Sequence, residues 1–154
     1  MIEEGKKAPS FSLKDDSGKK VSLSGLKGKT VVLYFYPKDF TGGCTQEACD
    51  FRDNFASLKK KKAVVLGVSR DPVDKHSKFR EKYELPFPLL SDETGEVCEK
   101  YGVWKQKTLY GKKFMGIERT TVVIGPDGKI KKIFPKVRVK GHVEAVLEAL
   151  SSQK

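Results

Sequence analysis

Two short runs of apolar residues constrain the fold of this chain more than any other feature. They are VVLYFY at 31–36 and AVVLGV at 63–68. Runs that are rich in β-branched and aromatic residues, without polar alternation, are typical of strands buried on both faces of a parallel or mixed sheet. Between them, from about Cys44 to Leu58, apolar side chains recur every three or four residues, which predicts a helix. This order predicts the α/β class, with helices that cover a central sheet.

Turn signals and helix caps place the remaining elements. Asp16-Ser17-Gly18 predicts an N-terminal β-hairpin, and Gly125-Pro126-Asp127-Gly128 predicts a second hairpin. Residues 103–117 show little periodicity and are expected to form a long, partly ordered connection. The other expected elements are a helix from Asp71-Pro72, an extended segment at 86–90, a short helix around 97–101 that ends at Gly102, and a C-terminal helix over 143–150.

The length and charge of the chain limit its organisation and its partners. No repeat or linker divides the 154 residues, so one domain is expected over 1–154. The net charge of +11 raises the alternative of a basic nucleic-acid-binding module. However, the lysines are spread along the chain and interleaved with acids, and the lysine run at 59–62 falls where a helix should end. A solvated surface is therefore favoured, and no specific nucleic-acid partner is expected.

The chain shows no sign of export or membrane insertion. No apolar run approaches the roughly 18–20 residues that a membrane-spanning helix requires, and the N-terminal segment lacks the apolar stretch of a secretory signal. Three cysteines are too few, and odd in number, for a secreted disulfide scaffold. We therefore expect no membrane partner and a reducing, cytoplasmic location.

The segment that follows the first buried strand, Pro37-Lys-Asp-Phe-Thr41-Gly-Gly-Cys44, is the most informative one. A cysteine in a first helical turn lies beside unpaired backbone N–H groups and the positive end of the helix dipole, which stabilise a thiolate. The Thr41 hydroxyl can reach the same pocket, and Gly42 and Gly43 allow the backbone to approach a small ligand. Cys44 is therefore the candidate reactive cysteine, in a site suited to a small anion or a peroxide-sized molecule.

A second cysteine, Cys49, follows five residues later. In a helix this spacing corresponds to about 140° around the axis and about 7.5 Å of rise, so the two residues cannot be bridged unless a turn unwinds. The spacing indicates a redox switch, in which one sulfur reacts and the other captures it after local unfolding. Cys98, which lies beside Val97 and Tyr101, is expected to be a buried packing residue.

Other uses of these residues have weaker support. The C-x4-C pair has no companion pair, and His76 and His142 are the only histidines, so no metal site is expected. A cysteine–histidine hydrolase would need His142 beside Cys44, but His142 precedes the last helix and is expected to be solvated. A protein thiol-disulfide oxidoreductase is the main alternative, although the chain lacks the C-x-x-C motif of that class.

The residues from Tyr34 to Asp53 closely resemble the active-site region of the peroxiredoxins. The resemblance is greatest to the peroxiredoxin Q group, also called the bacterioferritin comigratory protein group. A P-x-x-x-T-x-x-C motif, combined with a downstream arginine before a strand, carries this resemblance, which extends over nearly the whole chain. Further matching segments are Gly5–Phe11, Leu90–Asp92, Lys113–Thr121 and Pro126–Ile130.

The resemblance implies a thioredoxin-like fold and a thiol-dependent peroxidase. Cys44 matches the family's peroxidatic cysteine, which attacks the O–O bond of a hydroperoxide and becomes a sulfenic acid. Thr41 and Arg119 match residues that bind the peroxide and the thiolate, and Pro37 matches a proline that shields the sulfur from water. Cys49 matches the resolving cysteine of many members, which implies an intramolecular disulfide.

The same resemblance implies the partners of the reaction. Hydrogen peroxide and small organic hydroperoxides are the expected substrates, and thioredoxin or a similar dithiol protein is the expected reductant. No metal, flavin or haem cofactor is implied, and the expected state is a monomer. Many members have proline in place of Gly42, so a loop that unfolds more readily is expected here. Phe40 and Phe114 fit either a preference for alkyl peroxides or burial in the core.

Overall fold

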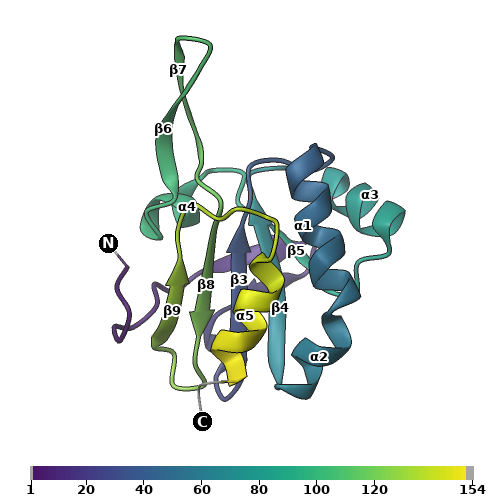
Figure 1. Ribbon diagram of the computed structural model, residues 1–154, viewed down its shortest axis with the longest axis vertical. Coiled ribbons are helices and arrows are strands. Elements are labelled where there is room, and N and C mark those ends of the chain that lie inside the picture. Colours follow the sequence, from purple (N-terminus) through teal and green to yellow (C-terminus); the bar gives the residue numbers. More distant parts are fainter. Residues whose placement is uncertain (1, 152–154) are drawn as a thin grey trace.

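The computed structural model describes residues 2–151 of the chain (Figure 1). Its centre is a seven-stranded sheet with the order β2-β1-β5-β4-β3-β8-β9. The strands of this sheet are β1 (Ser12–Asp15), β2 (Lys20–Ser22), β3 (Thr30–Phe35), β4 (Ala63–Ser69), β5 (Leu89–Ser91), β8 (Thr120–Ile124) and β9 (Ile130–Phe134). A separate two-stranded ribbon consists of β6 (Trp104–Leu109) and β7 (Lys112–Ile117). The helices are α1 (Gly42–Asp53), α2 (Phe55–Lys60), α3 (Val73–Tyr83), α4 (Glu96–Lys100) and α5 (His142–Ser151), with a 3-10 turn at Ser24–Leu26.

The sheet is mixed, because the three strands β3, β4 and β5 are parallel and its other pairings are antiparallel. Helices follow β3 and β4 and return the chain to the next parallel strand, as parallel pairing requires. The pairing of β1 with β2 is the predicted N-terminal hairpin, and the α/β class with a helix-covered mixed sheet is confirmed. No helix within residues 2–151 combines the length and the apolar character that a bilayer crossing demands.

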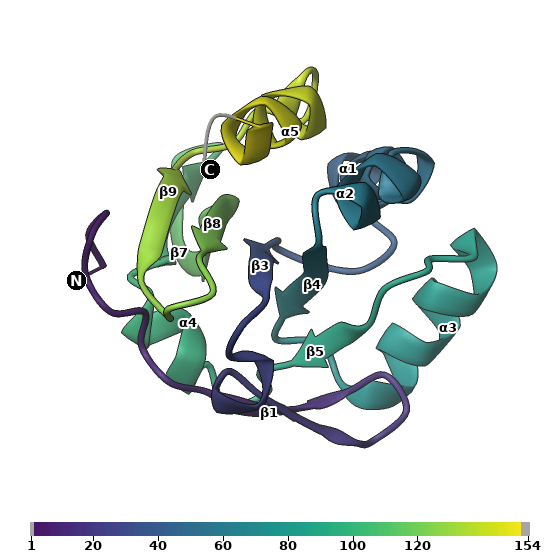
Figure 2. The same cartoon turned by 90° about the horizontal axis from the view of Figure 1, so that it is seen from below.

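The two faces of β3 serve two separate hydrophobic cores. Val32 and Tyr34 lie in the core that contains the apolar side chains of α1, α3 and α5. Val31, Leu33 and Phe35 lie in the core that contains those of α4. Figure 2 shows this division, with α1, α3 and α5 on one side of the sheet and α4 on the other. Since all five side chains are at most 1% exposed, the strand has no solvent-facing side and needs no polar alternation.

The helix predicted over Cys44–Leu58 is interrupted at Asn54. There α1 ends and α2 begins, and Asn54 has a non-helical backbone conformation (φ −106°, ψ 10°). Its side-chain amide donates to the backbone carbonyl of Asp50 at 2.9 Å. Such side-chain bonds compete with the helical ladder and favour breaks. The apolar spacing continues across the break, so periodicity alone does not reveal it.

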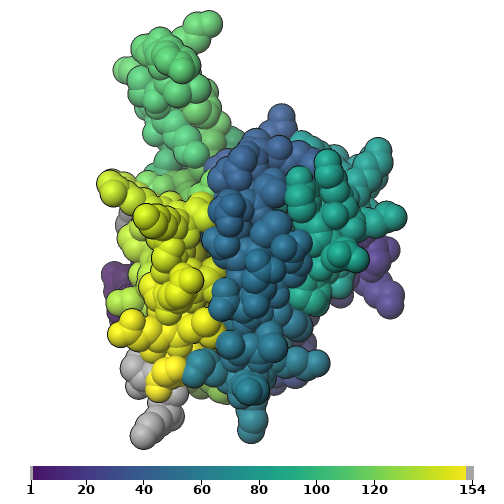
Figure 3. Space-filling model, turned by 45° about the vertical axis from the view of Figure 1, so that its right-hand side comes forward, coloured from purple at the N-terminus to yellow at the C-terminus, as the bar shows by residue number. Residues whose placement is uncertain are grey.

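The expectation of a partly ordered connection over 103–117 is wrong, because this segment is the antiparallel β6–β7 ribbon. Tyr110 and Gly111 at its tip have positive φ angles of 51° and 76°, as in the two-residue turns that suit twisted hairpins. The ribbon stands clear of the body of the molecule (Figures 1 and 3). Its tip therefore has few apolar partners, and its strands lack the alternation that marks a half-buried strand.

The expectation that His142 is solvated is also wrong. The residue begins α5 and is buried, with its Nε2 atom 2.7 Å from the Thr121 hydroxyl. Its ring contacts the rings of Phe51 and Phe134 edge-on. Burial, and then the positive charge of Arg119, lower the pKa of His142 to about 4. This histidine therefore packs α5 onto the sheet as a neutral side chain near pH 7.

Candidate active site

The sheet register brings Arg119 to the loop that leads to Cys44. Strand β3 ends at Phe35, and the chain continues through residues 36–41 into α1. In the antiparallel neighbour β8, Thr120 pairs with Phe35. The residue before Thr120 therefore lies beside this loop, although it is 75 positions away from Cys44 in the sequence.

Cys44 lies in the first turn of α1, as predicted. Thr41 is the N-cap residue, and its carbonyl accepts the backbone N–H of Thr45 at 2.9 Å. Nη2 of Arg119 donates to the Cys44 sulfur at 3.4 Å. The sulfur thus lies at a helix N-terminus and beside a guanidinium, the surroundings in which reactive cysteines are found.

Glu47 holds Arg119 in this position, one helical turn after Cys44. Nη1 of Arg119 donates to Oε1 of Glu47 at 2.8 Å, while Oε2 is buried and has no hydrogen-bond partner within residues 2–151. Burial raises the pKa of Glu47 to about 7, against the opposing effect of Arg119. Burial alone would lower the pKa of Arg119, but the charges of Glu47 and Cys44 outweigh it, and the shift is upward. Sequence reasoning missed Glu47, although its i+3 spacing from Cys44 is a signal for the same helix face.

Gly43 leaves the space that the guanidinium occupies. A Cβ atom at this position would lie 3.1 Å from Nη2 of Arg119, which is tighter than most real contacts. At Gly42, in contrast, an added Cβ would meet no atom within 4 Å. Gly42 therefore has a conformational effect only, whereas Gly43 permits the contact between Arg119 and Cys44.

Thr41 and Pro37 both lie in the segment between β3 and Cys44. The Thr41 hydroxyl donates to the backbone carbonyl of Lys38 at 2.8 Å, and the residue is exposed. Pro37 is half-buried at the start of the same loop. The structure therefore brings Cys44 and Arg119 together, and it engages the Thr41 hydroxyl in the turn that precedes α1.

Cys49 lies in the same helix as Cys44, and both are free thiols in this structure. Cys49 is half-buried. Burial raises the pKa of its thiol, and Asp53 and Asp50 add to this effect, while Arg52 opposes it. The helical spacing separates the two residues by about 7.5 Å along the axis, so this conformation does not permit a disulfide between them.

The site geometry agrees with the comparisons with known proteins. The profile of the AhpC/TSA family matches residues 4–133, which is most of the chain. The chain belongs to this family. Peroxiredoxin Bcp of Bacillus subtilis is 52% identical over 149 residues, which are 97% of this chain and 95% of that protein. Peroxiredoxin Bcp of Escherichia coli is 46% identical over 149 residues, with 97% and 96% of the two chains covered.

Solved structures of peroxiredoxins have the same fold. A mutant of Xylella fastidiosa PrxQ has a TM-score of 0.94 at 36% identity, over 99% of this chain and 97% of that one. Xanthomonas campestris bacterioferritin comigratory protein, which was studied for its alkyl peroxide reduction activity, has a TM-score of 0.91 at 38% identity, over 97% and 98%. The predicted membership of the peroxiredoxin Q group and the thioredoxin-like fold are confirmed, and the chain is a thiol-dependent peroxidase.

The third cysteine of this peroxiredoxin has a different environment. Cys98 is fully buried in α4, as expected for a packing residue. Both Asp92 carboxylate oxygens accept backbone N–H groups of α4, from Val97 at 3.3 Å and from Cys98 at 2.8 Å. Burial, and then the adjacent Asp92 carboxylate, raise the pKa of the Cys98 thiol far above its ordinary value. A thiol in this setting stays protonated and inert.

The two phenylalanines near the site are not core residues in this peroxiredoxin. Phe40 is 41% exposed and Phe114 is 45% exposed. Phe40 contacts the rings of Phe79 and Tyr83 in α3. Phe114 lies on the ribbon and lines a surface hollow with Pro37. The interpretation of these two residues as buried core is therefore wrong.

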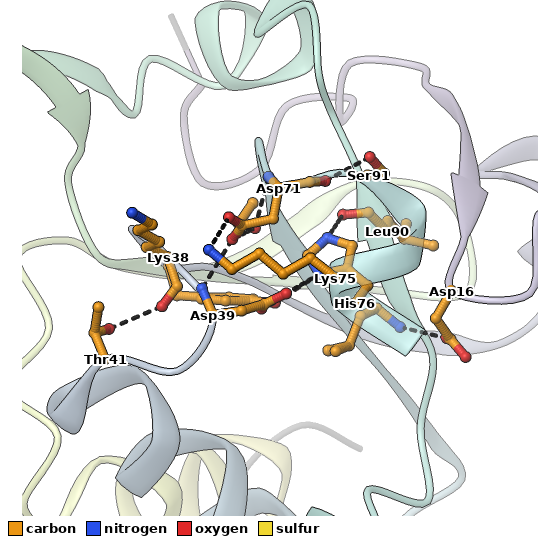
Figure 4. Close-up of polar contacts among 12 residues, drawn as sticks. Asp16, Lys38, Asp39, Thr41, Asp71, Lys75, His76, Leu90 and Ser91 are labelled. Carbon is orange, nitrogen blue, oxygen red and sulfur yellow. Dashed lines mark hydrogen bonds and ion pairs between the residues drawn. The ribbon is translucent and has the colours of Figure 1, made fainter. Parts of the chain in front are cut away.

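A buried polar network joins the same loop to α3 (Figure 4). Its centre is the contact between Asp39 Oδ2 and His76 Nδ1, at 2.6 Å. Asp39, Asp71 and His76 are close enough to hold a metal ion, but their facing atoms already engage one another and three neighbours. These neighbours are Tyr36, Ser69 and Lys75. The cluster is thus a closed hydrogen-bonded network rather than an open cation site, and sequence reasoning missed it.

Proposed function

We propose that this protein reduces hydrogen peroxide and small organic hydroperoxides through the Cys44 thiolate. The contact between the Arg119 guanidinium and the Cys44 sulfur in the first turn of α1 carries this proposal. The thiolate attacks the outer oxygen of the hydroperoxide, and the O–O bond breaks. With one proton taken up by the leaving oxygen, the products are water or an alcohol and a Cys44 sulfenic acid.

Each residue around Cys44 has a distinct role in this step. Arg119 stabilises the thiolate and polarises the peroxide, since its guanidinium has further N–H groups to donate. Pro37 limits the access of water to the sulfur. The Thr41 hydroxyl, which now donates to Lys38, turns toward the peroxide when the substrate is bound. These assignments agree with the reactivity of thiolates that lie at helix N-termini beside a cationic side chain.

We propose that Cys49 resolves the sulfenic acid within the same chain. The Cys49 thiol attacks the Cys44 sulfur, a disulfide forms, and water leaves. Because both cysteines lie in α1, the first turns of this helix must unwind before the sulfurs can meet. Thioredoxin or a similar dithiol protein then reduces the disulfide and returns both thiols.

Several further properties are part of the same proposal. Residues 1–154 form one domain that acts as a monomer in the cytoplasm, and it uses no metal, flavin or haem. The two core clusters share the strands of a single sheet, which supports one domain. Nucleic acid is not a specific partner, and the net charge of +11 belongs to a solvated surface.

The decisive experiment maps the thiols after one equivalent of hydrogen peroxide. The reduced protein is treated, alkylated and digested, and its peptides are analysed by mass spectrometry. We expect the loss of two thiols, an intrachain link between Cys44 and Cys49, and a free Cys98. A Cys44→Ser variant should consume no peroxide, and a Cys49→Ser variant should stop at an oxidised Cys44.

Two results would contradict this proposal in different ways. If Cys49 stays free in the unmodified protein while Cys44 is oxidised, the resolving thiol comes from another molecule. If all three thiols stay free after minutes, Cys44 is not the catalytic residue. An insulin-reduction assay provides the control for the alternative, a protein thiol-disulfide oxidoreductase, and we expect no activity in it.

A further inference from the structure

The loop that leads to Cys44 is attached to α3 and β5 through one buried histidine. His76 Nδ1 lies 2.6 Å from Asp39 Oδ2, and His76 Nε2 lies 3.0 Å from the backbone carbonyl of Leu90 (Figure 4). The other carboxylate oxygen of Asp39 accepts the Tyr36 hydroxyl at 2.5 Å. His76 and Asp39 have no solvent exposure at their side chains. The loop is therefore connected to α3 and to the central sheet by polar contacts that water does not weaken.

The hydrogen-bond geometry gives each nitrogen of this histidine a partner. The Leu90 carbonyl can only accept, so Nε2 donates to it. Asp39 Oδ2 faces Nδ1 at 2.6 Å, which is a short contact inside a buried network. Buried polar networks whose members are satisfied make the segments that they join more rigid.

A second contact attaches the backbone of the loop. The Asp39 N–H donates to Asp71 Oδ2 at 2.8 Å, and the same oxygen accepts the Ser69 hydroxyl at 2.7 Å. Lys75 pairs with the other Asp71 oxygen at 3.0 Å. Asp39 is thus bound through both its main chain and its side chain. It lies five positions before Cys44, and three before the start of α1.

The next residue, Phe40, has a strained backbone conformation that the contacts of Asp39 help to maintain. Phe40 has a φ angle of 65°, in the left-handed region that L-residues other than glycine rarely adopt. Its ring contacts Phe79, three positions after His76 on α3. Residues on one face of α3 therefore contact both Asp39 and Phe40, the two residues that the strained backbone conformation joins. If the polar anchor is lost, release of this strain favours movement of the loop and of the first turn of α1.

We propose that the Asp39–His76 pair is a positioning device for the peroxidatic cysteine. It acts through the loop, and it sets how readily α1 unwinds to let Cys49 reach Cys44. The inference rests on the proposed function, because it concerns the fate of the Cys44 sulfenic acid. A firmly anchored loop keeps the folded site, and a weakened anchor favours the unwound state in which resolution occurs.

Two reactions compete for the sulfenic acid, and their ratio reports the anchor strength. In the first, the Cys49 thiol attacks the Cys44 sulfur, which gives the disulfide and water. In the second, another molecule of hydrogen peroxide oxidises the Cys44 sulfenate to a sulfinate and is itself reduced to water. The first reaction needs the unwound helix, whereas the second proceeds in the folded site. The peroxide concentration that converts half of Cys44 to the sulfinate therefore rises with the ease of unwinding.

The test compares His76→Gln with Arg80→Gln in a single turnover at graded hydrogen peroxide. Arg80 also lies on α3 and also forms an ion pair, with Asp16 at 3.0 Å, but it does not contact the loop. We expect the half-sulfinate concentration to rise about tenfold in His76→Gln, which corresponds to about 1.4 kcal/mol in the opening equilibrium. It should change less than twofold in the control. Urea unfolding of both variants measures the loss of global stability.

The outcomes separate this inference from the proposed function. If the unmodified protein forms no Cys44–Cys49 disulfide, the proposed function fails. If it forms one, but the two variants shift equally or His76→Gln shifts nothing, the positioning role fails. Should His76→Gln not fold, Asp39→Ala removes the same pair from its other side and keeps the backbone hydrogen bond to Asp71. A folded Asp39→Ala variant with unchanged partitioning would overturn the inference.

Discussion

Cys44 and Cys98 are both buried cysteines in helices, yet their neighbours carry opposite charges. Their exposures, 1% and 0%, are nearly the same. The Cys44 sulfur accepts a hydrogen bond from the Arg119 guanidinium. Cys98 lies against the Asp92 carboxylate, and both this carboxylate and burial disfavour its thiolate. Similar burial thus leaves the two sulfurs beside opposite charges, and the charge next to a cysteine is one of the factors on which its reactivity depends.

The two helices also differ in how their N-termini are used. The first turn of α1 has no side-chain cap and presents its backbone N–H groups to the Cys44 site. In α4, the Asp92 carboxylate accepts the N–H groups of Val97 and Cys98 and so neutralises the positive end of the helix. A helix start activates a cysteine only where no acid already occupies it. The following predictions test this comparison, from the largest expected effect to the smallest.

Removal of the Arg119 guanidinium beside Cys44 should have the largest effect on the rate of reaction with peroxide. We expect Arg119→Gln to lower the second-order rate constant with hydrogen peroxide by roughly 100- to 1,000-fold, which is the usual loss for one preorganised donor at a charged transition state. Stopped-flow fluorescence of Trp104 provides the measurement. Arg138→Gln, at an exposed arginine, is the matched control. A loss of less than fivefold in Arg119→Gln would mean that the helix N-terminus alone activates Cys44.

Displacement of the same cation should have a smaller effect. Gly43→Ala places a Cβ atom 3.1 Å from Nη2 of Arg119, so the guanidinium must shift away from the sulfur. We expect about a tenfold lower rate constant, while stability stays level or rises because alanine favours helix by up to about 1 kcal/mol. Gly42→Ala gains the same propensity in open space and should keep its rate. Equal rates in the two variants would contradict the close approach of Arg119.

The Glu47 carboxylate, which pairs with Arg119, should affect how the free energy of unfolding depends on pH. The folded pKa of Glu47 is about 7 and its ordinary value is 4.5, so the folded protein binds more protons between these two pH values. Stability from this group is therefore fully present below about pH 4.5, and it falls as the pH rises toward 7 by up to about 1.4 kcal/mol per pH unit. Glu47→Gln removes this dependence and should lower activity only a few-fold, because an acceptor for Arg119 remains.

Urea unfolding at pH 5 and pH 8 measures this effect. We expect the difference between Glu47→Gln and the unmodified protein to favour the variant more at pH 8 than at pH 5. Asp50→Asn changes an acid on the same helix that is less buried, and it is the control. If both variants show the same pH dependence, Glu47 is not the group that titrates.

The smallest effect on activity is expected at Cys98. Cys98→Ala removes a fully buried thiol, which should cost about 1 kcal/mol of stability through lost packing. The rate constant with peroxide should stay within twofold of the unmodified protein, and the disulfide should form as before. Thiol titration of the folded protein checks the same point, since Cys98 should react only after denaturation. Rapid alkylation of Cys98 in the folded protein would contradict the conclusion that Cys98, unlike Cys44, is unreactive.

Local patterns predicted most of the fold and the reactive cysteine. The unbroken apolar runs indicated central strands because a strand buried on both faces cannot alternate. Cys44 was identified because a strand, a loop and a helix start with two glycines follow one another directly in the sequence. The β6–β7 ribbon was missed because it projects from the body of the molecule and joins a core at its base, through Trp104 and Ile117, so little burial pattern forms along it.

Contacts between distant residues account for the remaining differences. His142 was expected in solvent, but the aromatic rings of Phe51 and Phe134 enclose it. Asp39 and His76 are 37 positions apart, and neither has a sequence context that indicates burial. The Thr41 hydroxyl donates to the Lys38 carbonyl in the turn before α1, a bond that the sequence pattern does not indicate.

By itself the sequence determined the α/β class, the order of the main elements and the position of Cys44 at a helix start, because these depend on residues that are close along the chain. The tertiary structure decided which charge each cysteine meets. The register between β3 and β8 places Arg119 beside Cys44, and α4 carries Cys98 onto Asp92. Electrostatic effects depend on distance in space, and only the packed sheet and helices set those distances.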